Sequence, residues 1–146
     1  MGKILRVLIL ITFLTNYIFT LEDFTAFNLP IFVNNVKADA PPPLLAMDGA
    51  TVLVPFKVAP MSGVYLEWML PGGGVSFGFD DAGSGTSMWA VGEPFVWGIG
   101  WRVALCSPPI IVGDIIYVPL LSAFNEAAPF VVARISDDAI HIYNRY

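Results

Sequence analysis

Short apolar runs, most of them rich in β-branched residues, alternate along this chain with Gly, Pro and Asp. Two of the runs, residues 50–54 and 114–118, follow a glycine and lead through a valine into a proline. Runs of this length between turn residues predict β-strands. Proline fixes φ and lacks an N–H, so it ends a strand and is accepted in the first turn of a helix. Each Val-Pro pair therefore predicts a strand followed by a short helix.

These two runs belong to a longer phrase that the chain contains twice. The first copy is PPPLLAMDGATVLVPFKV (41–58), and the second is SPPIIVGDIIYVPLLSAF (107–124). Both have a proline pair, an apolar couple, a Gly beside an Asp, the predicted strand and the Val-Pro pair. A phrase that recurs in the same order indicates two copies of one structural unit.

Each copy is followed by a pattern typical of a β-hairpin. After the first copy, residues 64–68 and 75–79 flank the turn PGGG, and after the second, residues 130–135 and 139–143 flank SDD. Gly, Asp and Ser are the residues that tight turns favour. The last strand, 139–143, is expected to be an edge strand to which another chain could pair.

Two more strands, 87–91 and 101–105, are predicted between the copies, around Gly92, Gly98 and Gly100. The whole pattern predicts an α+β fold. In this fold a small twisted antiparallel sheet of about five strands packs around one or two short helices. It is built from two related strand–helix–hairpin units.

The N-terminal residues have the pattern of an export signal. Lys3 and Arg6 precede an apolar run that continues to Leu21 without another charge. Cleavage is expected after Ala38 rather than after Ala40, which would leave a proline directly behind the cut. The competing interpretations are a retained membrane anchor formed by residues 4–21, which are just long enough to span a bilayer, and a buried structural helix.

The sequence therefore predicts a signal peptide or anchor over residues 1–38 and one domain over residues 39–146. The domain is expected outside the cytoplasm, secreted or attached to the cell surface. Contact with the membrane is expected only through residues 4–21, if the leader is retained.

Composition and charge exclude several classes of protein. With 56% hydrophobic and 13% charged residues, the chain is not disordered. After residue 38 it has 4 basic and 10 acidic residues, a formal charge of −6. Such a domain has no electrostatic basis for binding nucleic acid or anionic lipid.

Few side chains in this sequence are suited to catalysis. The single histidine, His141, alternates with two isoleucines on a predicted strand and cannot by itself form a metal site or a Ser-His-Asp triad. The single cysteine, Cys106, allows no internal disulfide and is interpreted as a small buried apolar residue. The acidic pairs at 80–81 and 137–138 are interpreted as solvated turns. No catalytic, cofactor-binding or metal-binding residue is predicted, and the protein is not expected to be an enzyme.

The tryptophans are the candidate ligand-binding residues. Trp89, Trp97 and Trp101 lie within thirteen residues, together with Phe95. Aromatic faces pack against sugar rings, so the three indoles predict a glycan-binding strip if they are exposed. On a regular strand Trp97 and Trp101 would share a face, because they are four residues apart. The other interpretation is that the indoles fill the core of a small domain.

The order of these motifs resembles the copper amine oxidase N-terminal-like domain family, also called the stalk domain family, of exported proteins of Gram-positive bacteria. The resemblance covers about residues 43–146. It rests on the proline pairs, the turn glycines, the Val-Pro pairs and a Val-x-Trp-like strand. The residues that carry it are Val54, Pro55, Trp68, Gly92, Pro108, Pro109, Gly113, Val118 and Pro119.

This resemblance implies a non-enzymatic module of the cell envelope, with a structural, adhesive or partner-binding role and no cofactor. The family's module stands apart from the copper chemistry in its name. The partner is expected to be an envelope protein or a cell-wall glycan, and the alternative function is a carbohydrate-binding module that uses the aromatic strip. The chain departs from the family pattern at Lys57 and Leu121, where the family has an Arg, and at Ala133 and Arg134, where it has a Trp-acid pair.

Overall fold

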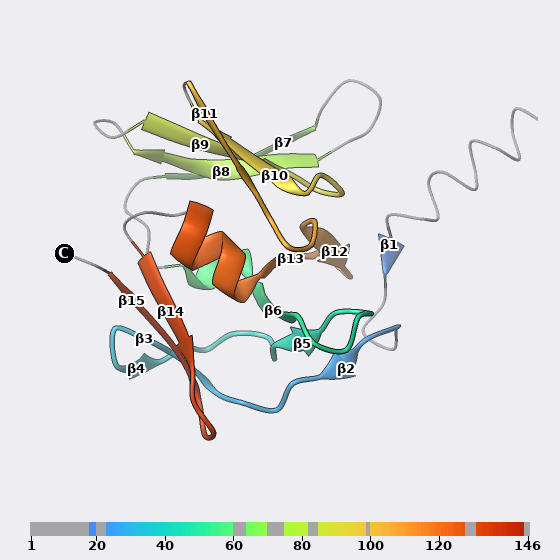
Figure 1. The fold of residues 1–146 in the computed structure, drawn as a ribbon, viewed down its shortest axis with the longest axis vertical. Coiled ribbons are helices and arrows are strands. Elements are labelled where there is room, and N and C mark those ends of the chain that lie inside the picture. The colour runs from blue at the N-terminus through green and yellow to red at the C-terminus, as the bar shows by residue number, and fades with distance from the viewer. Residues whose placement is uncertain are drawn as a thin grey trace, which may run out of the picture.

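Strands of three sheets account for most of the ordered elements. The computed structural model describes residues 18–19, 23–59, 64–69, 75–81, 85–98, 100–127 and 131–144. Figure 1 shows a five-stranded sheet at the top and a four-stranded sheet at the bottom, with a central sheet and two helical turns between them. Among the described residues, no helix is long and apolar enough to cross a membrane.

The central sheet places the two copies of the repeated phrase side by side. Its middle strands are β6 (Val52–Pro55) and β13 (Ile115–Pro119), which run antiparallel. Val54 lies opposite Val118, Tyr117 opposite Pro55, and Pro119 opposite Leu53. This register is symmetric about the Val54–Val118 pair, so the sequence repeat becomes a local twofold axis at the centre of the sheet.

The same symmetry extends to the next strands. β5 (Leu44–Leu45) pairs with β6, and β12 (Ile110–Val112) pairs with β13. The turns of both hairpins contain a glycine in the left-handed region, Gly49 with φ 70° and Gly113 with φ 66°, which a side chain would strain. Two short strands, β1 (Ile18–Phe19) and β2 (Thr25–Ala26), complete the order β1-β12-β13-β6-β5-β2.

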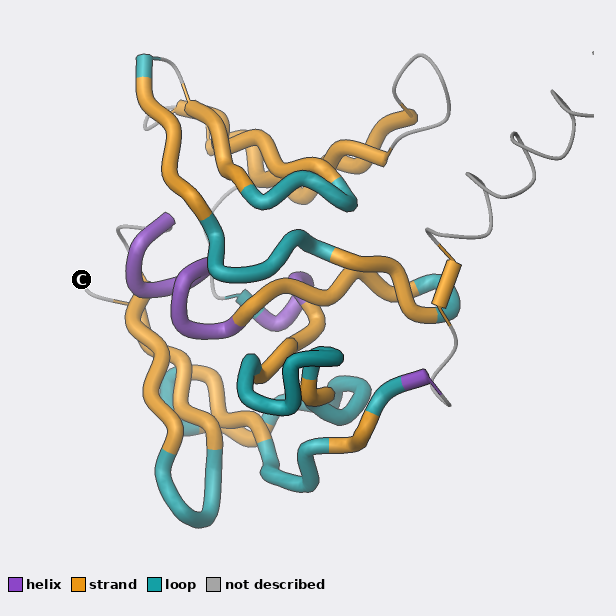
Figure 2. Tube along the Cα trace, turned by 45° about the vertical axis from the view of Figure 1, so that its right-hand side comes forward, coloured by secondary structure: helices purple, strands orange, loops and turns teal. Residues whose placement is uncertain are grey.

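Short helical turns follow both Val-Pro pairs. η2 (Phe56–Val58) is a turn of 3-10 helix after β6, and η3 (Ser122–Ala127) is a π-type helix shortly after β13. Figure 2 shows these turns between the upper and lower sheets. The predicted positions of the strand-to-helix junctions are therefore seen, but neither turn develops into a long helix.

The five-stranded sheet is antiparallel throughout. Its strands are β7 (Val64–Met69), β8 (Val75–Asp81), β9 (Gly85–Ala90), β10 (Phe95–Gly98) and β11 (Trp101–Ala104), which lie in the order of the chain. The hairpin predicted from residues 64–68 and 75–79 is confirmed as β7–β8. The prediction missed β10, which has only three residues between Pro94 and Gly98.

The four-stranded sheet combines the C-terminal hairpin with residues near the N-terminus. Its order is β14 (Val131–Ile135), β15 (Ile140–Asn144), β3 (Ile31–Val33) and β4 (Val36–Lys37). The predicted pairing of β14 with β15 is confirmed, but β15 is an interior strand because β3 pairs parallel to it. The prediction of an edge strand at 139–143 was wrong.

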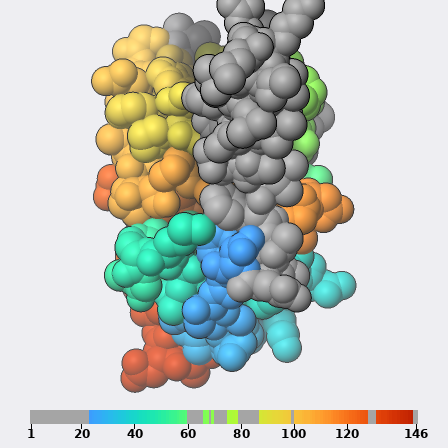
Figure 3. All heavy atoms as spheres, turned by 90° about the vertical axis from the view of Figure 1, so that its right-hand side faces the viewer, coloured from blue at the N-terminus to red at the C-terminus, as the bar shows by residue number. Residues whose placement is uncertain are grey.

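The domain boundary predicted between residues 38 and 39 would separate β3 and β4 from β14 and β15, although all four strands belong to this sheet. Ile31 of β3 is buried in the main core, and the N–H of Ile140 donates to the carbonyl of Pro30 at 2.9 Å. The N–H of Asn34 donates to the carbonyl of Ile142, also at 2.9 Å. In Figure 3 the blue surface of the chain from residue 23 onward lies against the rest of the lower part of the molecule. Residues before 39 are therefore structural members of this sheet.

The predicted α+β fold class was wrong. The described chain is mostly β-structure in three sheets, instead of one sheet packed around one or two helices. The physical reason is the brevity of the turns after the Val-Pro pairs. Pro60 disfavours helical backbone at the residue before it, and η3 is only six residues long.

A single large core fills the space between the sheets. Phe56 and Phe124 of the helical turns pack there with Phe77 and Trp89 of the five-stranded sheet. Ile140 enters it from the four-stranded sheet. Leu44, Leu53, Val112 and Tyr117 form a smaller cluster.

One side chain of η3 bonds the main chain of β14. The Asn125 Nδ2 donates to the Ala133 carbonyl at 3.0 Å, and the Ala133 N–H donates to the Asn125 Oδ1 at 2.7 Å. Because Ala133 exchanges these bonds on the side away from β15, Asn125 ties η3 to the outer edge of the sheet.

Candidate functional site

Trp89 belongs to the core and cannot contact a ligand. Its side chain is fully buried, with ring centroids 5.0 Å from Phe56 and 6.0 Å from Phe77. The indole Nε1 donates to the Ser87 Oγ at 3.2 Å, which satisfies its only polar group.

Trp97 and Trp101 lie on opposite faces of the five-stranded sheet. A tight turn joins β10 to β11, so that Trp97 lies opposite Arg102 and Trp101 lies opposite Gly98. Residues directly opposite each other share a face, and Gly98 and Trp97 are neighbours, so their faces differ. Trp101 is 41% exposed, and its indole covers Gly98, where a Cβ would overlap the ring. The three tryptophans therefore do not form one strip.

The outward face of the five-stranded sheet carries a row of residues that crosses all five strands. Leu66 lies opposite Gly78, Gly78 opposite Met88, Met88 opposite Trp97, and Trp97 opposite Arg102. Leu66 is 39% and Met88 44% exposed, and Trp97 is half-buried. We call these five residues the upper row. The sequence signal for it was the alternation within the strands, which the prediction used only to count strands.

One cation ends the upper row. The guanidinium carbon of Arg102 lies 4.4 Å from the centroid of the Phe95 ring, and this ring lies 6.1 Å from that of Trp97. A guanidinium over an aromatic face is held by the ring's quadrupole and keeps its N–H groups free to donate. Phe95, Trp97 and Arg102 therefore form an aromatic and cationic corner at the end of an apolar face.

The other residues that carry the family resemblance hold turns and strands together. Gly92 has φ 83°, and its N–H donates to the Pro109 carbonyl at 2.8 Å. Pro109 is buried and Pro108 is half-buried before β12. Trp68 lies on β7 at the register position opposite Ser76. Gly92 and the two prolines therefore have structural roles at these positions.

A second row crosses the outward face of the four-stranded sheet. Arg134 lies opposite His141, His141 opposite Phe32, and Phe32 opposite Lys37. We call these four residues the lower row. The prediction treated His141 as an isolated strand residue, because its neighbours across the sheet come from distant parts of the chain, including the segment assigned to the leader.

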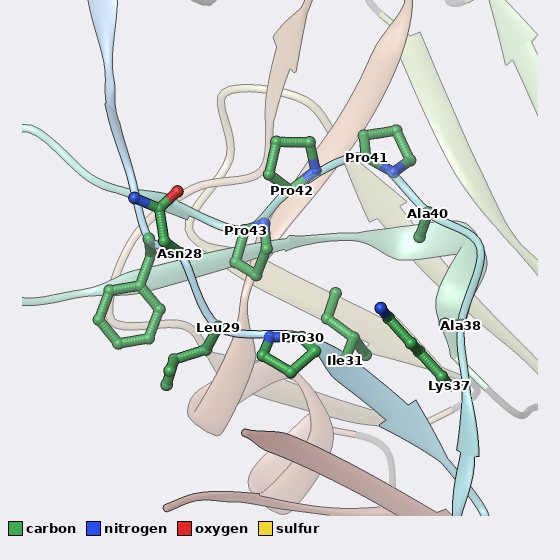
Figure 4. Close-up of a pocket in the computed structure, with 11 residues that line it drawn as sticks. Asn28, Leu29, Pro30, Ile31, Lys37, Ala38, Ala40, Pro41, Pro42 and Pro43 are labelled. Atoms are coloured by element: carbon green, nitrogen blue, oxygen red, sulfur yellow. The ribbon is translucent and has the colours of Figure 1, made fainter. Parts of the chain in front are cut away.

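Beside Lys37 lies a shallow groove of about 320 Å³. In Figure 4 the side chain of Lys37 lies beside Ile31, and Ala40, Pro41, Pro42 and Pro43 line the groove above it. The hydroxyl of Tyr117 donates to the carbonyl of Pro42 at 3.1 Å, which ties this proline segment to the central sheet. Burial raises the pKa of Tyr117 above its usual value, so the phenol stays protonated as a donor. Apart from Lys37 and Asn28, the described lining is apolar.

Cys106 differs from its predicted environment. The residue is exposed, whereas the sequence interpretation made it buried. Its Sγ lies 3.2 Å from the hydroxyl of Ser122, and its N–H also donates to that hydroxyl, at 3.2 Å. The reason is its position in the loop that follows β11, outside the strand pattern. Within the described residues, no three His, Cys, Asp or Glu side chains lie close enough together to hold a metal ion.

No family model, curated protein or solved structure matches this chain. The likeness to the stalk domain family therefore remains a prediction from the quoted motifs.

Proposed function

We propose that this protein is a non-enzymatic, exported module of the cell envelope that holds a partner protein through the upper row. The observation that carries the proposal is the row itself. It places Leu66, Met88 and Trp97 on the solvent side of a sheet whose other side packs Phe77, Trp89 and Val96 into the core. Antiparallel sheets usually turn polar side chains toward water on such a face, and exposed apolar side chains in their place are typical of an interaction surface.

The corner formed by Phe95, Trp97 and Arg102 has the composition of a binding hot spot. Tryptophan and arginine are enriched among residues that dominate binding energy. Arg102 is pre-organised by its contact with Phe95 and can donate to a carboxylate of the partner. The partner surface expected here is apolar, with one acidic side chain facing Arg102.

Export is supported by the apolar run behind Lys3 and Arg6. The non-enzymatic role is supported by the shortage of catalytic side chains in the sequence, which contains one histidine. Glycan binding by Trp89, Trp97 and Trp101 together is not proposed, because Trp89 is buried and the other two lie on different faces.

The test is co-sedimentation of the full chain with isolated Gram-positive cell walls that retain their proteins, compared with walls treated with protease. Trp97→Ala is expected to weaken binding about 30-fold, as loss of a hot-spot tryptophan does. Arg102→Glu should weaken it further, because it places a negative charge against the partner's acid.

Trp101→Ala is the matched control, since it removes the same side chain from the opposite face and should bind like the wild type. Protease treatment should abolish binding. The proposal fails if all three variants bind equally, or if the wild type does not sediment with either preparation.

A further inference from the structure

The lower row combines aromatic rings with positive charge in a protein that is otherwise acidic. Phe32 and His141 lie in its middle, with ring centroids 5.6 Å apart and planes 21° apart. Tyr143, two residues along β15 and so on the same face, has its ring 5.9 Å from that of His141 and almost parallel to it, at 2°. The three half-buried rings form a continuous aromatic series over β3 and β15.

Hydrogen bonds fix the outer groups of this series. The Tyr143 hydroxyl donates its proton to the Oδ1 of Asn35 at 3.2 Å. Its contact with the Nδ1 of His141, at 3.3 Å, is then a hydrogen bond only if that nitrogen carries the proton. With the proton on Nδ1, the neutral ring has Nε2 as an acceptor for a hydroxyl of a bound molecule.

Charged side chains stand at both ends of the lower row. Arg134 lies opposite His141 and is exposed, and Lys37 lies opposite Phe32 at the groove of Figure 4. Within the described part of the chain, no carboxylate bonds either cation. One acid, Asp138, lies in the turn before β15, close enough for the charge of His141 to act on it. Ser136 Oγ donates to it at 2.7 Å and lowers its pKa, and positive charge on His141 contributes a smaller part.

We propose that the outward face of the four-stranded sheet binds a short glycan that carries a carboxylate, such as a uronic acid oligosaccharide. The aromatic series offers apolar surface to the C–H faces of the sugar rings. Arg134 binds the carboxylate through its two parallel N–H groups, and Asn35 and the Nε2 of His141 bond hydroxyls. This site goes beyond the proposed function, because it lies on another sheet and takes another class of ligand.

The composition of the face favours this ligand over other classes. A short aromatic series with a cation at each end matches sugar rings that carry a carboxylate more closely than it matches the apolar surface of a protein partner. Nucleic acid is disfavoured because the chain has a net charge of −5 and would repel a long polyanion. A short oligosaccharide with one or a few carboxylates contacts only the local positive charge.

The test is calorimetric titration of the full chain with tri-galacturonate and, as the uncharged ligand, with the neutral galactose trimer. Tri-galacturonate is expected to bind, and the neutral trimer at least about tenfold more weakly, because it lacks the charge-assisted bonds to Arg134. Binding of tri-galacturonate should weaken as salt is raised.

Three variants locate the site. Arg134→Gln should lower the affinity for tri-galacturonate about tenfold and leave the weak binding of the neutral trimer unchanged. Tyr143→Ala should weaken both ligands. Arg102→Gln, on the other sheet, should bind like the wild type, and thermal unfolding of each variant establishes that it is folded.

Equal affinity for the two trimers would overturn the carboxylate specificity, and equal loss in Arg102→Gln and Arg134→Gln would overturn the location. Absence of binding by the folded wild type would overturn the site itself. None of these results depends on whether the upper row holds a protein, so failure of this inference and failure of the proposed function are distinguishable.

Discussion

In the first copy of the repeated phrase, Pro55 is followed by a three-residue turn, and the chain then enters the five-stranded sheet. In the second copy, Pro119 is followed by the longer turn η3, and the chain enters the four-stranded sheet. The strands before both prolines nevertheless pair in the same register about Val54 and Val118. The two copies are alike where they contact each other and differ where they contact the rest of the chain.

The difference shows which part of the repeat is constrained. A change in register of β6 would move its buried face to the other side of the sheet, so pairing across the twofold axis holds both copies to one geometry. Beyond the axis, each hairpin pairs with the strands that the chain brings to it. The first hairpin continues into β9–β11, which follow it in sequence, and the second receives β3 and β4 from far upstream.

The largest expected effect is the loss of stability when β3 and β4, which pair with the second hairpin, are removed. A chain of residues 39–146 lacks β3 and β4, so β15 loses its parallel partner and the core loses Ile31. We expect it to show no cooperative thermal unfolding by circular dichroism, because it loses two strands and part of the core, and a typical domain is stable by only about 5–15 kcal/mol. A chain of residues 23–146 should unfold cooperatively.

A peptide of residues 27–38, added to the shorter chain, should restore part of the cooperative transition. Identical unfolding curves for the two chains would show that the second hairpin is stable without β3 and β4. This result would contradict the proposed difference between the two copies.

The next largest effect is the loss of unfolding free energy when the residue after each of the two prolines is replaced by alanine. Phe56 and Leu120 occupy equivalent positions, and both are fully buried. Phe56→Ala should cost about 3–5 kcal/mol and Leu120→Ala about 2–5 kcal/mol in the free energy of unfolding. The first should be the larger, because the Phe56 ring also contacts Phe77 at 4.7 Å and Trp89 at 5.0 Å between centroids.

Urea titration measures both changes. The Trp89 emission should shift in Phe56→Ala and stay nearly constant in Leu120→Ala. The reverse order of stabilities would mean that the packing of the second copy is the tighter one.

The smallest effect lies in the hairpin turns. The turn of the first copy is longer, and the carboxylate of Asp48 accepts from the N–H groups of Ala50 and Thr51 and from the Thr51 hydroxyl. These bonds, that of the Thr51 hydroxyl first, lower the pKa of Asp48 below 3.8. Because the folded-state pKa is the lower one, this contribution to stability is present above pH 3.8 and is lost as the pH falls through the folded value.

Asp48→Ala should therefore lower the unfolding temperature slightly at neutral pH, and the difference from the wild type should vanish at strongly acidic pH. Asp48→Asn, which keeps an oxygen acceptor, should show a smaller difference. A difference independent of pH would exclude the carboxylate as its cause.

The strands of four or more residues, β10 excepted, could be predicted from the sequence, because alternation and turn residues are local signals, whereas the strands of two or three residues were missed. β10 was missed because only three residues stand between Pro94 and Gly98. β3 and β4 were missed because their residues were assigned to the leader, although Asn34-Asn35 between two apolar runs is a hairpin signal. Both asparagines have positive φ, 48° and 67°, as such turns require.

The candidate surfaces could be predicted only in part. Trp97 was identified, but its face depends on the turn at Gly98 and Gly100, where a count along one strand no longer applies. The row through Arg134, His141 and Phe32 needs the pairing of β15 with β3, a contact between residues more than a hundred positions apart. Local patterns carry no information on such a pairing.

The bonds between Asn125 and Ala133 affect the tendency of the protein to aggregate at high concentration. An open strand edge is a template on which other chains can add as strands and grow into aggregates. The Asn125 carboxamide already occupies the N–H and carbonyl of Ala133, in the middle of the outer edge of β14. The Asn125 side chain therefore obstructs the addition of another strand to β14 and disfavours aggregation through this edge.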